Sequence, residues 1–408
     1  MLSCTPPFVG INRIAAHGQR IGAMEKRRRI AVVIPKFGLV GGAEGFAAEL
    51  TERIAADPRF EIHVFANRWA DPSGRIVFHP IPIVRFPKFL TTPSFAWFAG
   101  REISAAGPFD LIHTHDRISR ADVYTMHGIP HRWWVREVRR KRMSLFDRAL
   151  ARVEDRLVSE GGCRRFLAVS ELTRKIFLDE YPIDAARVTV VHPGIDASPY
   201  AKLDRERCRR EIRGRFGIVP DEPLILFVSM NFAIKGLDHL LRGLGRLRAG
   251  SPEKRFRLLV IGRGDEKAYG QLARELGLGD AVVFAGAVAR EKLPEFYLAG
   301  DLYAMLSRFD TFGMVVLEAM AAGLPVLISG AVGARDIVRE GENGFVVENP
   351  ENGDAVAERI GTMLSVYARE RMGREALKTA GENSWDRTVA RVLAIYEEIW
   401  ADQRLMNS

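Results

Sequence analysis

The stretch Ser307–Pro325 reads S-R-F-D-T-F-G-M-V-V-L-E-A-M-A-A-G-L-P, and the rest of the chain is interpreted outward from it. An apolar run typical of a strand, 302–306, precedes this stretch, and a second apolar run, 325–328, follows it. Between them the pattern predicts a short helix that is apolar nearly all round and therefore buried. Gly323 suits a helix C-terminus, and Pro325 prevents the helix from continuing.

Two acids, Asp310 and Glu318, lie on either side of the predicted start of this helix. A helix that opens just after Gly313 leaves backbone N–H groups unpaired and carries a partial positive charge, which favours phosphate. The amides of Gly313, Met314 and Val315, with an acid on each side, therefore suit the diphosphate and hydroxyls of a sugar nucleotide. Taken alone, two acids at this spacing are more often a surface acid and a core helix with one capping glutamate.

The longer run F-D-T-F-G-M-V-V-L-E-A-M-A-A-G-L-P-V-L, 309–327, resembles the donor-site segment of the retaining glycosyltransferases of family 4. These enzymes have the two-domain GT-B fold. The resemblance implies that Glu318 holds the ribose hydroxyls and that Asp310 holds sugar hydroxyls near the transferring carbon, where the family usually has Glu. It also places Phe312 and the three amides at the donor diphosphate.

Composition and charge limit the class of protein. The 408 residues indicate about two domains, and 47% hydrophobic residues give an ordinary globular core. Three cysteines without metal-ligand spacing fit a reducing compartment, and no apolar run is long enough to predict a membrane span. The net charge of +9 favours an anionic partner. Residues 1–28 lack a signal-peptide pattern; we expect a disordered leader, or sequence upstream of a true start at Met24.

In the first half, predicted strands end at residues suited to ligand binding. The run 30–34 leads to Gly41-Gly42 and a helical pattern from Ala43, so the backbone there can approach a phosphate closely. Strands at 109–114 and 122–126 end at His115 and His127, and ligands in open α/β sheets lie beyond such strand ends. The resemblance implies that the glycine pair faces the donor diphosphate and that His127, then His115, lines the sugar and acceptor pocket. Ordinary loop glycines and hydrogen-bonded loop histidines remain the alternatives.

The window 132–142, R-W-W-V-R-E-V-R-R-K-R, is the most basic in the chain. Basic residues beside adjacent tryptophans are typical of a helix at a membrane surface. The alternative is a solvated helix face, and no nucleic-acid-binding motif accompanies the patch. We therefore predict contact with an anionic acceptor or a membrane through Arg132, Trp133, Trp134, Arg139, Arg140 and Arg142.

The second half opens with an apolar strand, 223–229, and then Lys235-Gly236. A lysine after a strand can meet a phosphate as a point charge, although a solvent-facing lysine is as common. In the family a lysine here binds the donor diphosphate, and an arginine commonly stands where this chain has Met230. Some other cation must replace that arginine, and Arg263 and Arg308 are the candidates.

Alternating strands and helices in both halves predict an α/β protein with two doubly wound, Rossmann-like domains facing a cleft. We divide the chain into an acceptor domain (29–200), a nucleotide-sugar domain (201–383) and a helix (384–408) that, as in other GT-B enzymes, crosses back to the first domain.

The resemblance implies a retaining hexosyltransferase that needs no metal or other cofactor, since no D-x-D triplet is present and positive charges serve the diphosphate instead. The segments V-S-M-N-F-A-I-K-G and A-D-V-Y-T-M-H-G are similar to lipopolysaccharide-core glucosyltransferases, which favours UDP-glucose and a glycan or glycolipid acceptor. We expect a cytoplasmic protein, with peripheral attachment to the inner face of the cytoplasmic membrane as an option. A GT-B epimerase or phosphorylase and a non-catalytic membrane or glycolipid binder are the alternatives.

Overall fold

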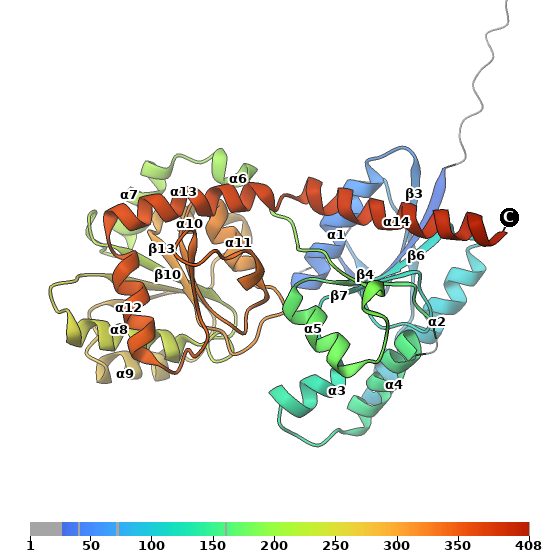
Figure 1. Ribbon diagram of the computed structural model, residues 1–408, viewed down its shortest axis with the longest axis horizontal. Coiled ribbons are helices and arrows are strands. Elements are labelled where there is room, and N and C mark those ends of the chain that lie inside the picture. The colour runs from blue at the N-terminus through green and yellow to red at the C-terminus, as the bar shows by residue number, and fades with distance from the viewer. Residues whose placement is uncertain (1–26, 40, 71–72, 160, 408) are drawn as a thin grey trace, which may run out of the picture.

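Two parallel sheets form the cores of two lobes (Figure 1). The computed structural model describes residues 27–39, 41–70, 73–159 and 161–407 of the chain. The leader predicted over residues 1–28 lies outside the described residues, except for Arg27 and Arg28. Arg28 already belongs to the first strand.

The first lobe contains a seven-stranded sheet in the order β5-β3-β1-β6-β7-β8-β9, and each neighbouring pair is parallel. Its strands are β1 (Arg28–Val33), β3 (Phe60–Ala66), β5 (Val77–Pro80), β6 (Leu111–Thr114), β7 (Val123–Met126), β8 (Arg165–Ala168) and β9 (Val188–Val190). The short strands β2 (Lys36–Phe37) and β4 (Arg68–Trp69) pair separately. The helices are α1 (Gly42–Ala55), η1 (Lys88–Leu90), α2 (Thr91–Ala105), α3 (His131–Trp133), the π-helical η2 (Trp134–Val138), α4 (Leu145–Ser159), α5 (Glu171–Glu180) and η3 (Ala185–Arg187).

The second lobe contains a six-stranded parallel sheet in the order β12-β11-β10-β13-β14-β15. Its strands are β10 (Leu224–Ser229), β11 (Arg257–Gly262), β12 (Val282–Gly286), β13 (Leu302–Met305), β14 (Val326–Ser329) and β15 (Gly344–Val347). Its helices are α6 (Ser198–Ala201), α7 (Arg205–Arg215), α8 (Leu237–Gly250), α9 (Glu266–Glu275), η4 (Arg290–Lys292), α10 (Leu293–Ala299), α11 (Met314–Ala321), η5 (Gly333–Ile337), α12 (Gly353–Met363) and α13 (Val366–Glu382). All six residues of β10 are buried, as their unbroken apolar run predicts for a central parallel strand.

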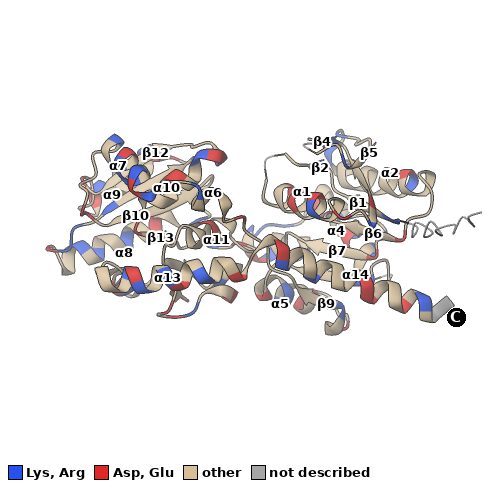
Figure 2. Cartoon of the chain, turned by 90° about the horizontal axis from the view of Figure 1, so that it is seen from above, with Lys and Arg blue, Asp and Glu red and all other residues tan. Residues whose placement is uncertain are grey.

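The last helix, α14 (Trp385–Asn407), leaves the second lobe and packs on the first (Figures 1 and 2). Its buried residues Val392, Ile395, Tyr396, Ile399 and Trp400 join the same core cluster as strands β1 and β3. Tyr396 also donates to or accepts from the His113 ring at 2.5 Å. The predicted return of the C-terminal helix is confirmed, and with it the GT-B arrangement of two Rossmann-like lobes.

The strand order fixes where a ligand can bind. In both sheets the order reverses beside the first strand, between β1 and β6 in one lobe and between β10 and β13 in the other. Open α/β sheets bind ligands beyond the strand ends at such a reversal. The loops that follow these four strands carry Gly41-Gly42, His115, Lys235 and the segment 307–313.

In the described part of the chain, no helix is both long enough and apolar enough to pass through a bilayer.

Candidate active site

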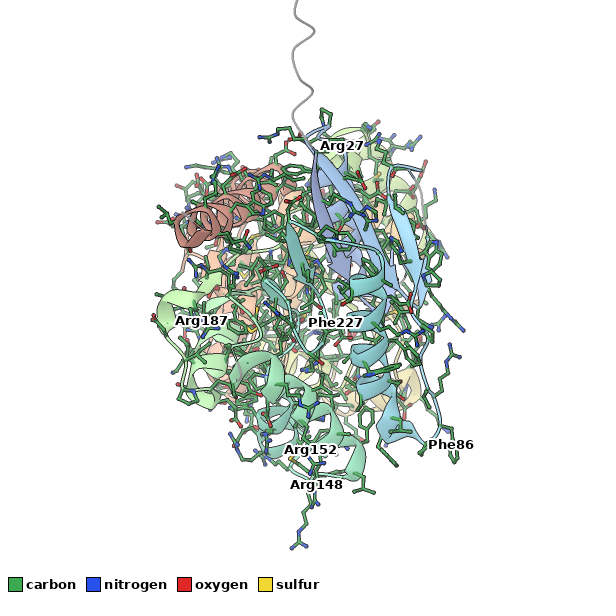
Figure 3. All side chains as sticks on the ribbon, turned by 90° about the vertical axis from the view of Figure 1, so that its right-hand side faces the viewer. Arg27, Phe86, Arg148, Arg152, Arg187 and Phe227 are labelled. Carbon is green, nitrogen blue, oxygen red and sulfur yellow. The ribbon has the colours of Figure 1, made fainter. Side chains whose placement is uncertain are left out.

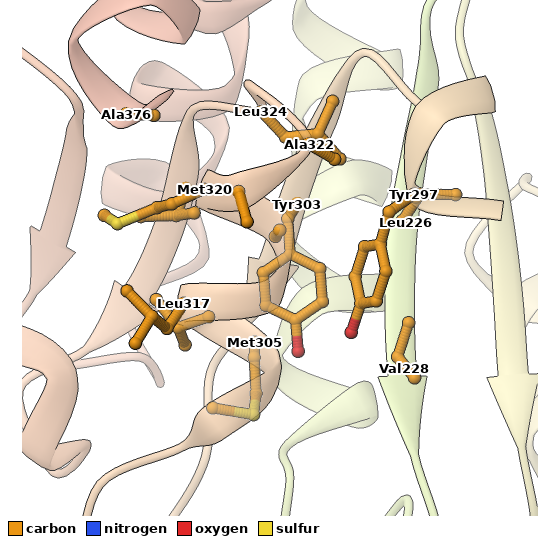
Figure 4. Packing of buried hydrophobic residues seen from close by; sticks show 14 of the residues in the cluster. Leu226, Val228, Tyr297, Tyr303, Met305, Leu317, Met320, Ala322, Leu324 and Ala376 are labelled. Atoms are coloured by element: carbon orange, nitrogen blue, oxygen red, sulfur yellow. The ribbon is translucent and has the colours of Figure 1, made fainter. Parts of the chain in front are cut away.

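The acid segment between β13 and α11 has the predicted shape. Gly313 has φ of 92°, in the left-handed region that glycine adopts without strain, and it directly precedes α11. Figure 4 shows α11 residues Leu317 and Met320 packed in the core with Tyr303 and Met305 of β13. Phe312 is 3% exposed, whereas Met314 and Val315 are half-buried. The N–H groups of Gly313, Met314 and Val315 donate to no other atom of the described residues. These amides remain available to a ligand anion.

Lys235 and Asp310 form an ion pair across the reversal point of the second sheet. Both side chains are largely buried, at 23% and 16% exposure. Gly236, with φ of 72°, sits so close to the end of β13 that a Cβ there would lie 1.9 Å from the Leu306 carbonyl oxygen. This close approach holds the lysine loop against the acid loop, and it brings two of the predicted donor residues into direct contact.

Glu318 lies inside α11, half-buried, and accepts a hydrogen bond from the Tyr297 hydroxyl at 3.0 Å. Burial raises the pKa of Glu318, while the Tyr297 hydrogen bond and the positive charge of Arg290 act in the opposite direction. Arg290 also approaches the other lobe, since a Cβ on Gly45 of α1 would lie 3.4 Å from its Nη1 atom. Neither Tyr297 nor Arg290 was predicted from the sequence.

The glycine pair lies at the start of α1, as predicted. Gly41 directly precedes α1, and Gly42 is exposed with open space where a Cβ would stand. The carboxylate of Glu44 folds over Gly41, because a Cβ on that glycine would lie 1.9 Å from Glu44 Oε2. Arg290 of the other lobe approaches α1 three residues further on, at Gly45.

Arg263 and Arg308, the two cations proposed to replace the family arginine, differ in whether an acid of the protein already pairs with them. Arg308 forms a two-pronged ion pair with Asp238, with N–O distances of 2.9 and 2.7 Å, so it is already engaged. Arg263 follows β11, is exposed, and forms no side-chain hydrogen bond or ion pair with any described residue. Met230 is 66% exposed at the end of β10. Arg263 remains the candidate cation for the donor.

The predicted histidines form one cluster at the ends of β6 and β7. His115 Nδ1 lies 2.9 Å from His127 Nε2, and the centroid of the tilted His113 ring lies 4.4 Å from that of His115. Burial lowers the pKa of His127 to about 3 and the pKa of His113 to about 3, and it holds the pKa of His115 well below its usual value. Phe46 of α1 contacts the His127 ring edge-on at 4.9 Å. The rings are neutral at pH 7, suited to hydrogen bonding rather than to carrying charge.

A cavity of about 350 Å³ lies between the lobes. Its walls come from both sides of the cleft: Arg117, Gly128, Ile129, His131 and Trp134 from the first lobe, and Phe309, Asp310 and Thr311 from the second. Gly128, the neighbour of His127, reaches this cavity. Of the two predicted acids, Asp310 and Glu318, Asp310 lines this cavity.

The cavity wall includes residues that the sequence did not reveal. His131 Nε2 lies 2.8 Å from Asp147, a carboxylate that is 1% exposed. Hydrogen bonds from Ser144 and His131 and the charge of Arg139 hold the pKa of Asp147 below its ordinary value, although burial alone would raise it. Arg117 is also held by a buried carboxylate, because its Nε atom donates to Glu154 at 2.8 Å. These side chains lie in loops and helices without a recognisable motif, and only their position in the fold brings them together.

The side chains of the basic window, residues 132–142, have different surroundings in the structure. The rings of Trp133 and Trp134 lie 6.0 and 5.9 Å from the ring of Phe309 in the second lobe, and both tryptophans are half-buried. They therefore face the cleft between the lobes, and their contact with an anionic acceptor or a membrane stays a prediction. Arg132 pairs with Asp155, and Arg139 pairs with Asp147 at 3.0 Å. Arg140 and Arg142 are exposed and form no side-chain ion pair with a described residue.

Comparison with known proteins agrees with this geometry. Residues 40–199 match the model of "Glycosyltransferase Family 4", and residues 209–379 match that of "Glycosyl transferases group 1". The chain belongs to glycosyltransferase family 4. It is an enzyme, a hexosyltransferase with the GT-B fold, and this family membership supports the transferase among the three classes that the sequence left open.

Relatives of this glycosyltransferase include the D-inositol 3-phosphate glycosyltransferase of Acidothermus cellulolyticus, 27% identical over 94% of this chain and 93% of the relative. The same enzyme of Geodermatophilus obscurus is 32% identical over 71% of this chain and 66% of the relative. Among solved structures, WaaG, a glycosyltransferase involved in lipopolysaccharide biosynthesis, has a TM-score of 0.74 at 20% identity and covers 90% of this chain and 99% of its own. Anabaena HepE in complex with UDP and glucose has a TM-score of 0.68 at 21% identity and covers 91% and 100%. At these identities the solved structures establish the fold alone.

Proposed function

We propose that this glycosyltransferase moves a hexose from a nucleotide diphosphosugar, with UDP-glucose favoured, to a hydroxyl of a glycan or glycolipid, with retention of configuration and without a metal. The observation that carries the proposal is the cavity between the lobes, which Asp310 lines from the donor side and Trp134 from the acceptor side. Directly behind Asp310, the unpaired amides of residues 313–315 open α11.

Each donor residue has a role that its position supports. The three amides, together with Lys235 and Arg263, bind the diphosphate and stabilise the charge that develops as it leaves. Glu318 holds the ribose hydroxyls, and Tyr297 keeps its carboxylate in place at 3.0 Å. Gly41-Gly42 approaches the diphosphate from the other lobe, and His127 and His115 support the sugar pocket as neutral rings. Fixed cations and amides in a closed cleft supply the electrostatic stabilisation that a divalent metal gives elsewhere.

Different observations favour two different classes of acceptor. The similarity of short segments to lipopolysaccharide-core glucosyltransferases, together with the fold of WaaG, favours a glycan of the lipopolysaccharide core. The relatives named D-inositol 3-phosphate glycosyltransferase favour a small phosphorylated alcohol instead. The second of these acceptors carries a phosphate.

A donor screen followed by turnover tests the proposal. UDP-, GDP- and ADP-sugars are compared by thermal shift, and the donor that stabilises the protein most is then supplied in labelled form with each acceptor class. We expect nucleotide release that depends on acceptor, a product with the donor's anomeric configuration by proton NMR, and unchanged turnover in EDTA. An inverted product or loss of activity in EDTA would contradict the retaining or the metal-free part, respectively.

For location, we propose a cytoplasmic enzyme that attaches to the inner membrane face through an apolar–basic end of the first lobe. This end consists of Phe86, Trp97, Leu145, Arg148 and Arg152. The three apolar side chains are 88%, 59% and 70% exposed. The segments η1, α2 and α4 that carry or adjoin them pack on one another, and Figure 3 shows Phe86, Arg148 and Arg152 at the same end of the lobe. Exposed apolar side chains beside arginines fit an anionic bilayer.

Sedimentation with vesicles tests this surface. Phe86→Ser with Leu145→Ser should weaken binding to phosphatidylglycerol vesicles and leave turnover on a soluble acceptor unchanged. Val219→Ser, at an exposed apolar residue 57% accessible in the other lobe, is the matched control. Equal vesicle binding by all three proteins would remove the proposal.

A further inference from the structure

A second hollow, of about 620 Å³, lies beside the cleft, and five of the residues that line it are cationic: Arg132, Arg136, Arg140, Lys141 and Arg142. We call it the basic hollow. Val135, which is 1% exposed, contributes an apolar wall. The volume is in the range of ordinary small-molecule sites and exceeds what a single inorganic ion needs.

The chain folds back on itself to build this hollow. After η2 the Lys141 N–H donates to the Val135 carbonyl at 3.2 Å, and Arg140 takes φ of 48°, a left-handed conformation that few residues other than glycine adopt. This turn sets the three consecutive cations 140–142 opposite Arg132 and Arg136. Gathering five like charges is unfavourable unless anions compensate them.

The carboxylates of the described residues compensate only two of these cations. Arg132 pairs with Asp155, and Arg136 pairs with Glu137 and, at 2.9 Å, with Glu180. Arg140, Lys141 and Arg142 form no side-chain ion pair or hydrogen bond with any described residue. Three cations on one wall of a hollow therefore lack an anion, and Arg and Lys groups in such numbers are the usual ligands of phosphate.

The basic hollow and the reaction cavity share one short helical segment. His131 and Trp134 line the cavity, while Arg132, Val135 and Arg136 line the hollow, so the two sites lie on different faces of α3 and η2. A helix with its side chains is about 10–12 Å across. A molecule bound in the hollow is therefore on the order of 10 Å from the reacting hydroxyl, a distance that a phosphorylated sugar or glycolipid spans.

We propose that the basic hollow binds a phosphate ester of the acceptor, so that this enzyme selects anionic acceptors by a group remote from the hydroxyl that it glycosylates. The inference rests on the proposed function for the identity of the acceptor, but the binding of phosphate itself does not. The phosphate belongs either to a soluble phosphorylated sugar or to a lipid headgroup.

Inorganic pyrophosphate is the probe, titrated by calorimetry into the full-length protein with the donor site filled by saturating UDP. The test variant is Arg140→Gln/Lys141→Gln/Arg142→Gln. The matched control, Arg148→Gln/Arg152→Gln/Arg156→Gln, removes the same charge from three exposed arginines of α4 that also form no side-chain ion pair with a described residue. We expect saturable binding in the wild type and the control. In the test variant we expect an affinity at least about tenfold weaker, because removing one charge-assisted hydrogen bond to phosphate reduces affinity by about that factor.

Equal weakening in both variants would show an effect of net charge alone and overturn the proposal, as would the absence of saturable binding in the wild type. Phosphatidylglycerol vesicles distinguish the two sources. If pyrophosphate displaces the vesicles from Phe86→Ser/Leu145→Ser, whose apolar–basic end no longer attaches, the phosphate is that of a lipid headgroup; if pyrophosphate binds this variant and displaces no vesicles, it is that of a soluble ester. UDP affinity is measured in parallel. Failure of UDP to bind the wild type contradicts the proposed function, and pyrophosphate binding to Lys235→Ala without UDP still tests the hollow.

Discussion

Lys235 and Asp310 form an ion pair between the loops that follow β10 and β13, the two strands at which the order of the second sheet reverses. The lysine is expected to bind the donor diphosphate and the carboxylate to bind sugar hydroxyls. Their contact means that neither group is positioned alone. A diphosphate that attracts the lysine also sets the direction in which the carboxylate accepts hydrogen bonds, so donor binding and sugar orientation are coupled.

Replacing Lys235 tests this coupling. Lys235→Ala removes a cation from the departing diphosphate and leaves a largely buried carboxylate without its partner, so we expect turnover to fall by about 10²–10³. Steady-state kinetics with saturating donor measures the change. Lys292→Ala is the control, because Lys292 is 65% exposed and, within the described part of the chain, pairs with Glu295 alone. Equal turnover in the two variants would contradict the role of Lys235.

Glu318→Gln should separate binding from stability. Burial raises the pKa of Glu318 above its unfolded value, so the folded protein holds this proton more tightly and loses stability as the pH rises past the unfolded pKa. Glutamine carries no charge and can still accept from Tyr297. We therefore expect an equal or higher free energy of unfolding at pH 7 in urea denaturation.

The same variant should bind UDP about 10–100 times more weakly, because the ribose hydroxyls no longer donate hydrogen bonds to a charged acceptor. Calorimetric titration with UDP measures this. Unchanged UDP affinity would show that Glu318 does not contact the nucleotide.

The sequence predicted what depends on local pattern. The unbroken apolar runs of β1, β10 and β13 mark central parallel strands, and Gly313 marks the start of α11, because both signals lie within a few neighbouring residues. β5 was missed, since its four residues V-F-H-P are exposed or half-buried at a sheet edge and end in proline.

Contacts between residues that are far apart in the sequence could not be predicted from the sequence. Arg290 is 28 positions before Glu318 and appears in an unremarkable charged run, yet it lies in the field of that acid and beside Gly45. The surroundings of the tryptophan pair could not be predicted for the same reason. Beside basic residues it has the pattern of a membrane helix, and only the second lobe supplies the Phe309 ring that turns it toward the cleft. Helical periodicity alone does not show which face a neighbouring lobe covers.

The buried histidine cluster should make stability depend on pH. The pKa values of His113 and His127 fall to about 3 in the folded protein, compared with about 6.5 when unfolded. Between these values the unfolded chain binds more protons, so stability is lost as the pH falls below about 6.5. At pH 5 each ring lowers the free energy of unfolding by about 2 kcal/mol.

Urea denaturation at pH 7 and pH 5 measures this loss. His127→Gln, which cannot take up a proton, should lose less stability over the same interval, by about 2 kcal/mol. A wild type equally stable at both pH values would show that these rings are not held neutral.

The cleft contact between Trp134 and Phe309 should affect the acceptor and not the donor. The two rings lie 5.9 Å apart and both line the cavity, so Trp134→Ala removes an aromatic wall where the acceptor binds. Removing such an aromatic wall costs about 1.4 kcal/mol, which corresponds to about a tenfold higher KM for the acceptor with the donor KM unchanged. Because the rings touch, Phe309→Ala and the double variant should show non-additive effects. Trp97→Ala, on the exposed face of α2, is the matched control, and turnover on a soluble acceptor should not change. An equal rise of KM in Trp97→Ala, or an unchanged KM in Trp134→Ala, would mean that the acceptor binds outside the cavity, and additive effects would show that the two rings act independently.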